Sequence, residues 1–350
     1  MNMRTKVLGS KVAVLILLAL MIMLVLAGCG KKEEHAVVQN DKGALEKTEI
    51  KYQGWASQVL FPELAEDLGY LAPLKLKWVG NTISGPQDIQ SVATGDIDFG
   101  GAFTGAIVNL KASNAPIKYV IGYYGVDDKS YYALVVNQDS PLKDGRDFIG
   151  KKIAVNTPAA HNEFIIKEYL RKQGLTEAEI KQVTLAVLPP VNAEQALRQG
   201  QVDGAILGGM FKDKAFDRGG VRTVFTDYDI FGKFTGGGYV FTEKFIRDNP
   251  NTVRKFVEAT AKAIEWAKAT PREEVIARME KIIKERKRNE DASTVNYWRS
   301  TGVSGKGGLA SDTEIQMWID WLVKEGKLKA GQIKPSDVYT NEFNPYVNEK

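Results

Sequence analysis

The sequence is poor in the residues that build most enzyme active sites and metal centres. Its 350 residues include one cysteine and two histidines. A single cysteine cannot form an internal disulfide, and zinc sites in proteins draw mainly on cysteine and histidine. The sequence has no G-x-S-x-G nucleophile motif, no phosphate-binding P-loop and no convincing dinucleotide-binding fingerprint. We therefore expect a protein that is not an enzyme and that holds no metal and no cofactor.

One long hydrophobic run is present, and it lies at the N-terminus. Residues 12–27 are apolar without interruption and follow a stretch with three basic residues. The run is shorter than the roughly 20 residues that a membrane-spanning helix needs. It ends in Leu-Ala-Gly-Cys at residues 26–29, a small-residue processing site like those of secretory signals. We therefore predict a cleaved signal peptide at residues 1–28, with Cys29 first in the mature chain. The alternative is an uncleaved membrane anchor in which the cysteine occurs by chance.

The charge balance gives no indication of nucleic acid as a partner. The formal net charge is +4, and removal of the three basic residues of the signal lowers it to +1. Residues 29–47 are polar and have no usable apolar period. We expect them to form a disordered tether to a body that folds outside the cytoplasm.

From residue 48 onward, strand patterns alternate with helix patterns, and the series occurs twice. The two series contain related stretches, "GDIDFGGAFTG" at 95–105 and "GQVDGAILGGMF" at 200–211. In each, a glycine ends a helix, where it tolerates the left-handed conformation. An aspartate, Asp98 or Asp203, then begins a short strand, and we expect it to bond nearby backbone rather than a ligand. Two such series indicate an α/β protein with two lobes, each a mostly parallel sheet flanked by helices.

Beyond residue 242 the sequence predicts mainly helices. Apolar residues at helical spacing indicate helices over 249–269, 271–286, 291–300 and 312–325. The charged run "KERKRNED" at 284–291 is typical of a solvated helix end rather than a binding patch.

Several segments together resemble the solute-binding proteins of nitrate/sulfonate/taurine-type ABC importers. These segments are the lipobox-like "LAGC", "YQGW" after the first strand, "GPQDIQSVATGDIDFG", "KKIAVNTPAAHNEFIIKEYLRKQGL" and "NAEQALRQGQVDGAI". The resemblance covers about residues 48–270, and the C-terminal helices are less distinctive. It implies a lipoprotein acylated at Cys29 and anchored to the cell membrane, a small-molecule ligand and a membrane permease as partner. We expect a monomer.

The resemblance also implies the type II periplasmic-binding-protein fold, in which two crossing strands join two lobes. The first lobe would comprise residues 48–137 and 239–350, and the second would comprise 138–238. The crossings would lie near Asn137 and Gly238, and the glycines at 236–238 would give the hinge flexibility. Ligand binding would close the lobes, and the permease would recognise the closed form.

Carried over position by position, the resemblance gives twelve candidate ligand-binding residues. They are Gln53, Trp55, Ser84, Phe103, Thr104, Tyr123, Thr157, Ala160, His161, Gly209, Met210 and Phe211. The four aromatic ones fall at predicted strand or loop ends, as expected of a cleft wall, although packing between helices would also place them there. Thr157 and Pro158 are typical of a helix start. The N–H groups of that helix start could hold an anion, or Thr157 could cap the helix without contacting a ligand. Relatives often carry Trp and Pro in the last loop, where this chain has Gly-Met-Phe-Lys, so its ligand can differ from the usual one.

The predicted binding loops contain no arginine, and their nearest cations are Lys129, Lys212 and Lys233. A sulfonate or taurine-like anion or zwitterion could still bind through backbone and hydroxyl donors. The surplus of aromatic residues leaves a thiamine-pyrimidine-like or riboflavin-like heteroaromatic as an alternative. Two further alternatives are a ligand sensor that feeds no permease and an enzyme on the same scaffold. His161 is the only histidine of the predicted folded body, which gives the enzyme little support.

Overall fold

The structure is a computed structural model, and it describes residues 43–158 and 160–349. The predicted signal peptide, Cys29 and most of the predicted tether lie outside the described residues. In the part of the chain that the structure describes, no helix is both long and apolar enough to cross a membrane.

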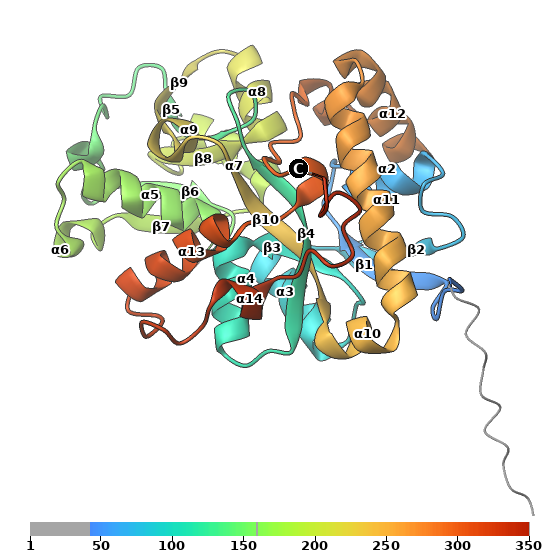
Figure 1. Cartoon of the computed structure of the whole chain (residues 1–350). Coiled ribbons are helices and arrows are strands. Elements are labelled where there is room, and N and C mark those ends of the chain that lie inside the picture. The colour runs from blue at the N-terminus through green and yellow to red at the C-terminus, as the bar shows by residue number, and fades with distance from the viewer. Residues whose placement is uncertain (1–42, 159, 350) are drawn as a thin grey trace, which may run out of the picture. The chain divides into compact units, whose positions relative to one another are not determined.

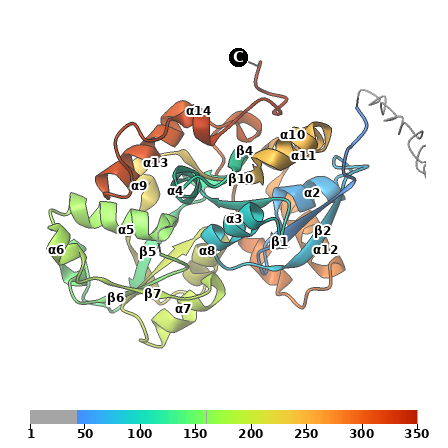
Figure 2. The same ribbon diagram turned by 90° about the horizontal axis from the view of Figure 1, so that it is seen from below.

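Within the described residues, ten strands form three sheets. The sheet orders are β1-β2, β3-β10-β4 and β7-β6-β8-β5-β9. The strands are β1 (Glu49–Gly54), β2 (Lys75–Asn81), β3 (Gly100–Phe103), β4 (Ile117–Val126), β5 (Tyr132–Asn137), β6 (Lys152–Val155), β7 (Thr184–Val187), β8 (Gly204–Gly208), β9 (Val221–Thr226) and β10 (Phe234–Thr242). Figures 1 and 2 show β3, β4 and β10 between the five-stranded sheet and the β1–β2 pair.

Helices cover these sheets. They are α2 (Phe61–Asp67), α3 (Gly85–Thr94), α4 (Thr104–Ala112), α5 (His161–Lys172), α6 (Glu177–Ile180), α7 (Pro190–Arg198), α8 (Gly209–Asp217), α9 (Asp227–Phe231), α10 (Glu243–Asp248), α11 (Pro250–Ala269), α12 (Arg272–Glu285), α13 (Asp312–Lys324) and α14 (Pro335–Val338). Short 3₁₀ helices occupy Gly145–Phe148, Ala292–Tyr297 and Lys306–Gly308. The helix predicted at 291–300 is thus a 3₁₀ turn, while α11, α12 and α13 match the predicted helices closely.

The α/β class is confirmed, but the sheets are mixed rather than mostly parallel. β1 pairs with β2 in parallel, as β6 does with β7 and β8. β10 is antiparallel to β3 and β4, and β5 is antiparallel to β8 and β9. The chain crosses between sheets just before β5 and again just before β10, and these two strands run antiparallel to their neighbours. A strand pattern in the sequence does not reveal the direction in which such a strand runs.

The passages between sheets differ from those we expected. β5 (Tyr132–Asn137) lies in the five-stranded sheet, although the predicted boundary after residue 137 would have assigned it to the first lobe. The chain passes from β4 to β5 through residues 127–131 and from β9 to β10 through 227–233. Gly238 lies inside β10, where a Cβ atom would sit 1.3 Å from the ring of Tyr119. The glycines at 236–238 therefore make room for tyrosine rings, which corrects their interpretation as a flexible hinge. The lobe boundaries themselves stay a prediction.

The two related stretches have the same local structure. Gly95 and Gly200 end α3 and α7 with φ of 85° and 69°, the left-handed conformation that the sequence predicts. Asp98 Oδ2 accepts the N–H of Lys51 at 2.7 Å, and Asp203 Oδ2 accepts the N–H of Lys152 at 2.8 Å. Each aspartate therefore ties the start of its strand to another strand. The bonded group is backbone, as predicted, but it belongs to a residue distant in the sequence and not to the turn itself.

The end of the predicted tether belongs to the folded body. Glu46 accepts the N–H of Thr252 at 3.0 Å, and the N–H of Lys47 donates to Thr252 Oγ1 at 3.0 Å. These bonds satisfy groups at the first turn of α11, where N–H groups lack intrahelical acceptors. Residues 46–47 are thus ordered, contrary to the prediction of a disordered segment up to residue 47.

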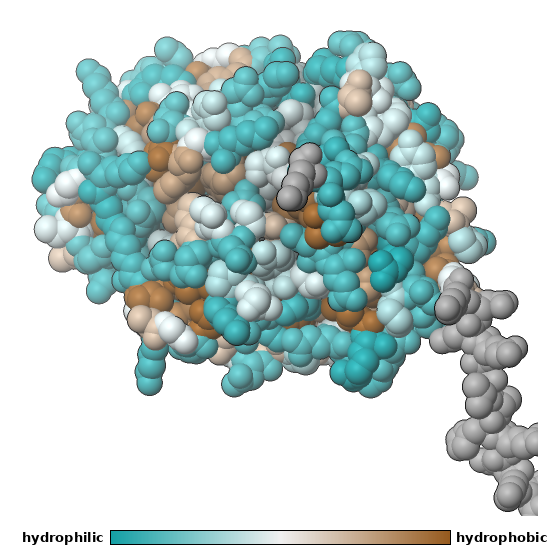
Figure 3. Space-filling view, in the orientation of Figure 1, coloured by the Kyte–Doolittle hydropathy of each residue, from teal (hydrophilic) through white to brown (hydrophobic). Residues whose placement is uncertain are grey.

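The hydrophobic core is continuous between the three-stranded sheet and the five-stranded sheet. Phe103 at the end of β3, Phe164 on α5 and Trp318 on α13 are buried and meet with ring centroids 4.5–6.1 Å apart. Aromatic pairs at such distances add to the stabilisation from burial. On the face shown in Figure 3, most of the surface is hydrophilic and apolar residues form separate patches.

Candidate functional site

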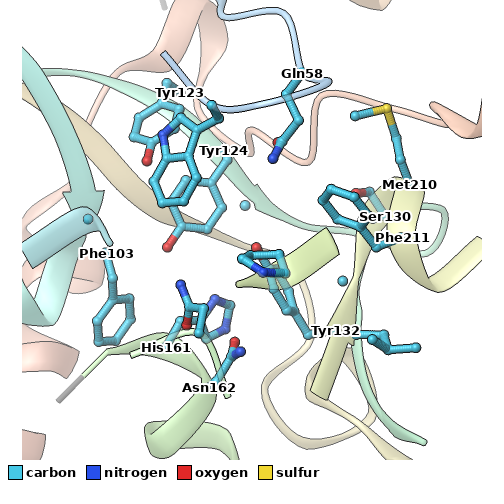
Figure 4. Close-up of a pocket in the computed structure, with 18 of the residues that line it drawn as sticks. Gln58, Phe103, Tyr123, Tyr124, Ser130, Tyr132, His161, Asn162, Met210 and Phe211 are labelled. Atoms are coloured by element: carbon cyan, nitrogen blue, oxygen red, sulfur yellow. The ribbon is translucent and has the colours of Figure 1, made fainter. Parts of the chain in front are cut away.

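A cavity of about 240 Å³ lies where strand ends and helix starts from the three-stranded and five-stranded sheets meet. Figure 4 shows aromatic rings around it, with His161 and Asn162 from the start of α5 and with Met210 and Phe211 from α8. The aromatic wall includes Trp55, Phe103, Tyr123, Tyr124, Tyr132 and Phe211. An aromatic enclosure with a few polar groups is the usual form of a small-molecule site.

Eight of the twelve candidate residues line this cavity. They are Trp55, Phe103, Tyr123, Ala160, His161, Gly209, Met210 and Phe211. They come from both halves of the repeated pattern, so the structure brings together residues that are as much as 156 positions apart in the sequence. Their contact with a ligand stays a prediction.

The other four candidates lie outside the cavity wall. Thr104 Oγ1 donates to the carbonyl of Gly236 at 3.2 Å, which holds the start of α4 against β10. Ser84 Oγ donates to Thr157 Oγ1 at 3.3 Å. Gln53 is on β1, and its Oε1 is buried without a hydrogen-bond partner in the described part of the chain. The bonds of Thr104, Ser84 and Thr157 give these three residues structural roles, whereas no bond assigns one to Gln53, and ligand contact by the four residues stays a prediction.

The helix that follows β6 begins later than its sequence predicts. We expected Thr157 as its N-cap and Pro158 as its first residue, but α5 starts at His161 with Ala160 in the N-cap position. Ala160 provides no side-chain cap. Helix geometry leaves the first N–H groups of α5 without intrahelical acceptors, and the helix dipole makes this end attractive to an anion. Because Ala160, His161 and Asn162 line the cavity, this helix end faces it.

His161 is held in a buried aromatic enclosure. Its imidazole is stacked on Phe103, with ring centroids 5.4 Å apart and planes 6° apart, and the Tyr132 ring centroid is 4.6 Å away. Its Nε2 lies 3.1 Å from Asp227 Oδ2, and the Asp227 side chain is completely buried. That contact is close but lacks the alignment of a hydrogen bond, and Nδ1 has no hydrogen-bond partner among the described residues.

Tyrosine hydroxyls supply neutral polar groups at the cavity. Tyr123 is stacked on Tyr239 with ring centroids 4.3 Å apart and meets Tyr124 edge-on at 4.9 Å. Burial raises the pKa of Tyr123, Tyr124 and Tyr239 well above 10, with nearby acidic and tyrosine side chains as further causes. These phenols therefore stay protonated and can donate a hydrogen bond to a ligand.

The sequence analysis missed the arginine of the site. Arg299 lines the cavity from the segment after the 3₁₀ helix Ala292–Tyr297, and its Nε lies 3.5 Å from Asp213 Oδ2. Lys212 is not a free cation, because its Nζ bonds Asp213 Oδ1 at 2.8 Å and sits 3.7 Å from the Tyr131 ring centroid. The expectation of a site without arginine is therefore wrong. The sequence pattern predicts a helix at residues 291–300, so Arg299 is not among the predicted binding loops.

The charged run at 284–291 supports the site from outside. Arg286 and Arg288 are each 8% exposed, and both lie 2.9 Å from a carboxylate oxygen of Glu63. Arg286 also donates to the carbonyl of Gln58 at 2.9 Å, in the loop that carries Trp55. Arg286, Arg288 and Glu290 of the run are therefore part of a buried ionic cluster, whereas Lys284 and Glu285 form the solvated helix end that the composition indicated.

Another buried carboxyl group lies on α3. Asp88 is 2% exposed; its Oδ2 accepts the N–H of Gly101 at 2.7 Å, and its Oδ1 has no partner in the described chain. Burial raises the pKa of Asp88 to about 7. Asp88 is not in the cavity wall, but Gly85 and Pro86 of the same helix turn are.

A larger cavity, of about 580 Å³, lies between α5, α6 and the end of α13. Several charged groups at its wall already bond one another, since Lys167 and Arg171 both contact Glu325. Paired charges have little left to offer a ligand, so we regard the smaller cavity as the candidate site. Within residues 43–158 and 160–349, no cluster of three or more His, Cys, Asp or Glu side chains could hold a metal ion.

Known proteins resemble this chain in sequence and in fold. An aliphatic sulfonates-binding protein of Escherichia coli (strain K12) is 28% identical over 211 residues, which are 60% of this chain and 62% of that protein. The alkanesulfonate-binding protein SsuA from Xanthomonas axonopodis pv. citri bound to MOPS has a TM-score of 0.66 at 20% identity, over 85% of this chain and 99% of that one. The periplasmic nitrate-binding protein NrtA from Synechocystis PCC 6803 has a TM-score of 0.68 at 13% identity, over 86% and 88%.

The structural matches establish the periplasmic-binding-protein fold that the sequence predicts. The family described as NMT1/THI5 like matches residues 64–274, which is more than half of the chain and includes most of the cavity wall. The chain belongs to the NMT1/THI5-like family.

Proposed function

We propose that this chain is an extracytoplasmic solute-binding protein that delivers a small organic anion or zwitterion of the sulfonate or taurine type to an ABC importer. The observation that carries the proposal is the start of α5 at the aromatic cavity. There three features occur together: a helix N-terminus whose N-cap residue, Ala160, provides no side-chain cap, a buried imidazole whose Nδ1 has no partner among the described residues, and Arg299. Backbone N–H groups at a helix start bind sulfonate or carboxylate oxygens readily. The names of the relatives, which refer to sulfonates, support the same ligand class.

We propose two lobes that close over the ligand. The first would contain β1–β4, β10 and the C-terminal helices, and the second would contain β5–β9 with α5–α9. Residues 127–131 and 227–233 would then be the hinge. The cavity wall takes Trp55, Phe103 and Arg299 from the first lobe and His161 and Phe211 from the second, so closure would complete the site.

We further propose that the mature protein begins at Cys29, carries lipid there and acts as a monomer beside a membrane permease. The support is the sequence pattern at residues 12–29. Metabolic labelling with a palmitate analogue tests this: the wild-type chain should take up label and Cys29→Ser should not. Equal labelling of both would contradict the anchor.

A thermal-shift screen of the purified full chain tests the ligand class. The screen should contain ethanesulfonate, taurine, nitrate and MOPS. A solute present at 100 times its dissociation constant adds about 2.7 kcal/mol to the free energy of unfolding. Met210→Trp, which places an indole in the cavity, should abolish the shift. Val347→Trp, at a 45% exposed position outside the cavity wall, should retain it. A shift that survives Met210→Trp would contradict binding in this cavity.

A heteroaromatic ligand is the second candidate, and the aromatic wall favours it. Trp55, Tyr123 and Tyr239 all line the cavity, and the two tyrosines are stacked. A flat ring could insert against such surfaces. The same screen with an aminopyrimidine and riboflavin distinguishes the two classes, and turnover of a stabilising compound would instead indicate an enzyme.

A further inference from the structure

We propose that binding of an anion in this cavity takes up one proton, which His161 holds between the ligand and Asp227. The inference rests on the proposed function, because it requires an anionic solute at the start of α5. It adds a regulatory property, namely that the affinity of the site increases as the pH falls.

The geometry fixes the ring between two acceptors. Phe103 stacks on one face of the imidazole, and Tyr132 packs against it with ring centroids 4.6 Å apart. Nε2 is at 3.1 Å from Asp227 Oδ2. Nδ1 has no partner in the described chain, and His161 lies in the cavity wall beside the first turn of α5. We place the anion at the Nδ1 edge of the ring. Nδ1 has almost no accessible surface in this structure and Nε2 is not aligned with Asp227, so binding must turn the ring slightly within its plane.

Neither neutral form of the imidazole suits both neighbours. A neutral ring carries one N–H, and its other nitrogen presents a lone pair. With the proton on Nε2, the lone pair of Nδ1 faces the ligand anion. With the proton on Nδ1, the lone pair of Nε2 faces the Asp227 carboxylate in a buried environment. Only the imidazolium donates in both directions, and its charge separates two anions that would otherwise repel each other.

Asp227 is held as the fixed acceptor of this arrangement. It begins α9, its side chain is completely buried, and its Oδ1 accepts the N–H of Tyr132 at 2.9 Å. Its Oδ2 has no hydrogen bond in the described residues, so it remains available to an N–H of the imidazolium.

The other groups around the ring do not supply the proton. Tyr132 on β5 and Tyr124 on β4 are titratable, and burial raises the pKa of both above their usual range, so they remain neutral. Phe103 on β3 and Phe234 on β10 are apolar. On α5 itself the next residue, Asn162, is uncharged. Water therefore delivers the proton to the ring when the anion enters, and the proton returns to water when the anion leaves.

The coupling between proton uptake and ligand affinity has a definite sign. Where the free ring is neutral, each pH unit downward should tighten binding by as much as tenfold, because one proton accompanies each ligand. Where the free ring is already protonated, the affinity should no longer depend on pH through this group. Histidine is the side chain that ordinarily makes this transition between pH 5 and 8.

Isothermal titration of the full chain with ethanesulfonate measures the proton directly. Titrations at one pH in two buffers of different ionisation enthalpy, neither of them a sulfonate, give the number of protons taken up per ligand. We expect an uptake that approaches one at the alkaline end of a series from pH 5 to 9 and falls at the acid end. Binding without proton uptake throughout this series overturns the inference but leaves the proposed function intact. Failure of every sulfonate to bind overturns the proposed function itself.

Two variants locate the proton. His161→Gln keeps an N–H donor but cannot hold a proton, so it should bind ethanesulfonate with no uptake. Asp227→Asn keeps an acceptor for the N–H of Tyr132 and removes the buried charge, so a neutral ring can serve the ligand and the uptake should also disappear.

Asp88→Asn is the matched control, since it removes another buried group whose pKa, about 7, lies in this range. Proton uptake by this variant should equal that of the wild type. Uptake that persists in His161→Gln and disappears in Asp88→Asn would assign the proton to Asp88 instead.

Discussion

At the scale of single residues, the repeat shows which polar groups the fold requires. Asp98 and Asp203 occupy equivalent positions and make equivalent backbone bonds, so they belong to the architecture. Asp88 on α3 corresponds, 105 positions later, to Ala193 on α7. The fold therefore accommodates an apolar residue at this position, and the buried carboxyl group of Asp88 is an addition specific to the first series.

Asp88 should make the protein less stable at alkaline pH. Burial raises its pKa from 3.8 to about 7, so the folded state binds this proton more tightly than the unfolded state. The favourable contribution is present in acid and is lost as the pH rises through 7. Asp88→Asn, which still accepts from Gly101, should gain roughly 2–3 kcal/mol in unfolding free energy relative to wild type between pH 5 and pH 8. Urea titrations at the two pH values measure this.

Asp203→Asn is the matched control for that prediction. It also replaces a carboxylate that accepts a backbone N–H, but Asp203 is exposed and its charge is solvated. It should show no comparable gain at pH 8. An equal gain in both variants would mean that the effect comes from net charge and not from burial.

At the scale of elements, the end of α12 is fastened to the loop before α2. Tyr52 donates to Glu63 at 2.5 Å, and Arg286 and Arg288 approach the same carboxylate. The cluster fixes residues 54–60, from which Trp55 and Gln58 reach the cavity. Removing one member of a buried ionic cluster leaves its partners without compensation.

Glu63→Gln should therefore be strongly destabilising. Arg288 would lose its carboxylate partner, and Arg286 would keep only Glu290, so the expected loss of unfolding free energy is about 3–5 kcal/mol. Glu285→Gln, on the exposed side of α12 where the side chain is 64% exposed, should change stability by less than about 0.5 kcal/mol. Chemical denaturation of the two variants side by side checks this, and a small loss for Glu63→Gln would show that the cluster contributes little.

A second pair of elements meets beside the cavity. Lys214 on α8 lies 3.0 Å from Asp291, and Tyr297 donates to Asp217 of α8 at 2.9 Å. Asp291 bonds Ser293 and Lys214, which lower its pKa to about 2, so it stays charged under all ordinary conditions. If the lobes close as proposed, these contacts form across the mouth of the cavity.

Lys214→Met should weaken solute binding by about two- to fivefold, the effect of losing one partly exposed ion pair in the closed state. Lys244→Met removes the exposed pair with Asp248 on α10 and should leave the affinity unchanged. Titration calorimetry of both variants with the same sulfonate tests this. Equal affinities for Lys214→Met and wild type would show that α8 and residues 291–299 do not take part in closure.

At the scale of the whole molecule, the sequence predicts the order of strands and helices, but it does not predict which segments that are far apart in the chain pair with each other. The alternation of strands and helices predicts the α/β class, and the repeated glycine and aspartate positions predict the local structure at Gly95 and Gly200. Strand direction in the mixed sheets could not be predicted, because it depends on which strands pair across long separations. The same limit explains Arg299, since nothing near it in the sequence indicates that residues 298–301 return to the cavity.

An anionic solute should bind at the start of α5, in the cavity between the three-stranded and five-stranded sheets. A crystal structure of the full chain soaked in ethanesulfonate tests it most directly. The account predicts sulfonate density within hydrogen-bonding distance of the first N–H groups of α5 and of His161 Nδ1, with the ethyl group against the aromatic wall. Ordered sulfonate only in the larger cavity near Glu325, with this one filled by water, would contradict it.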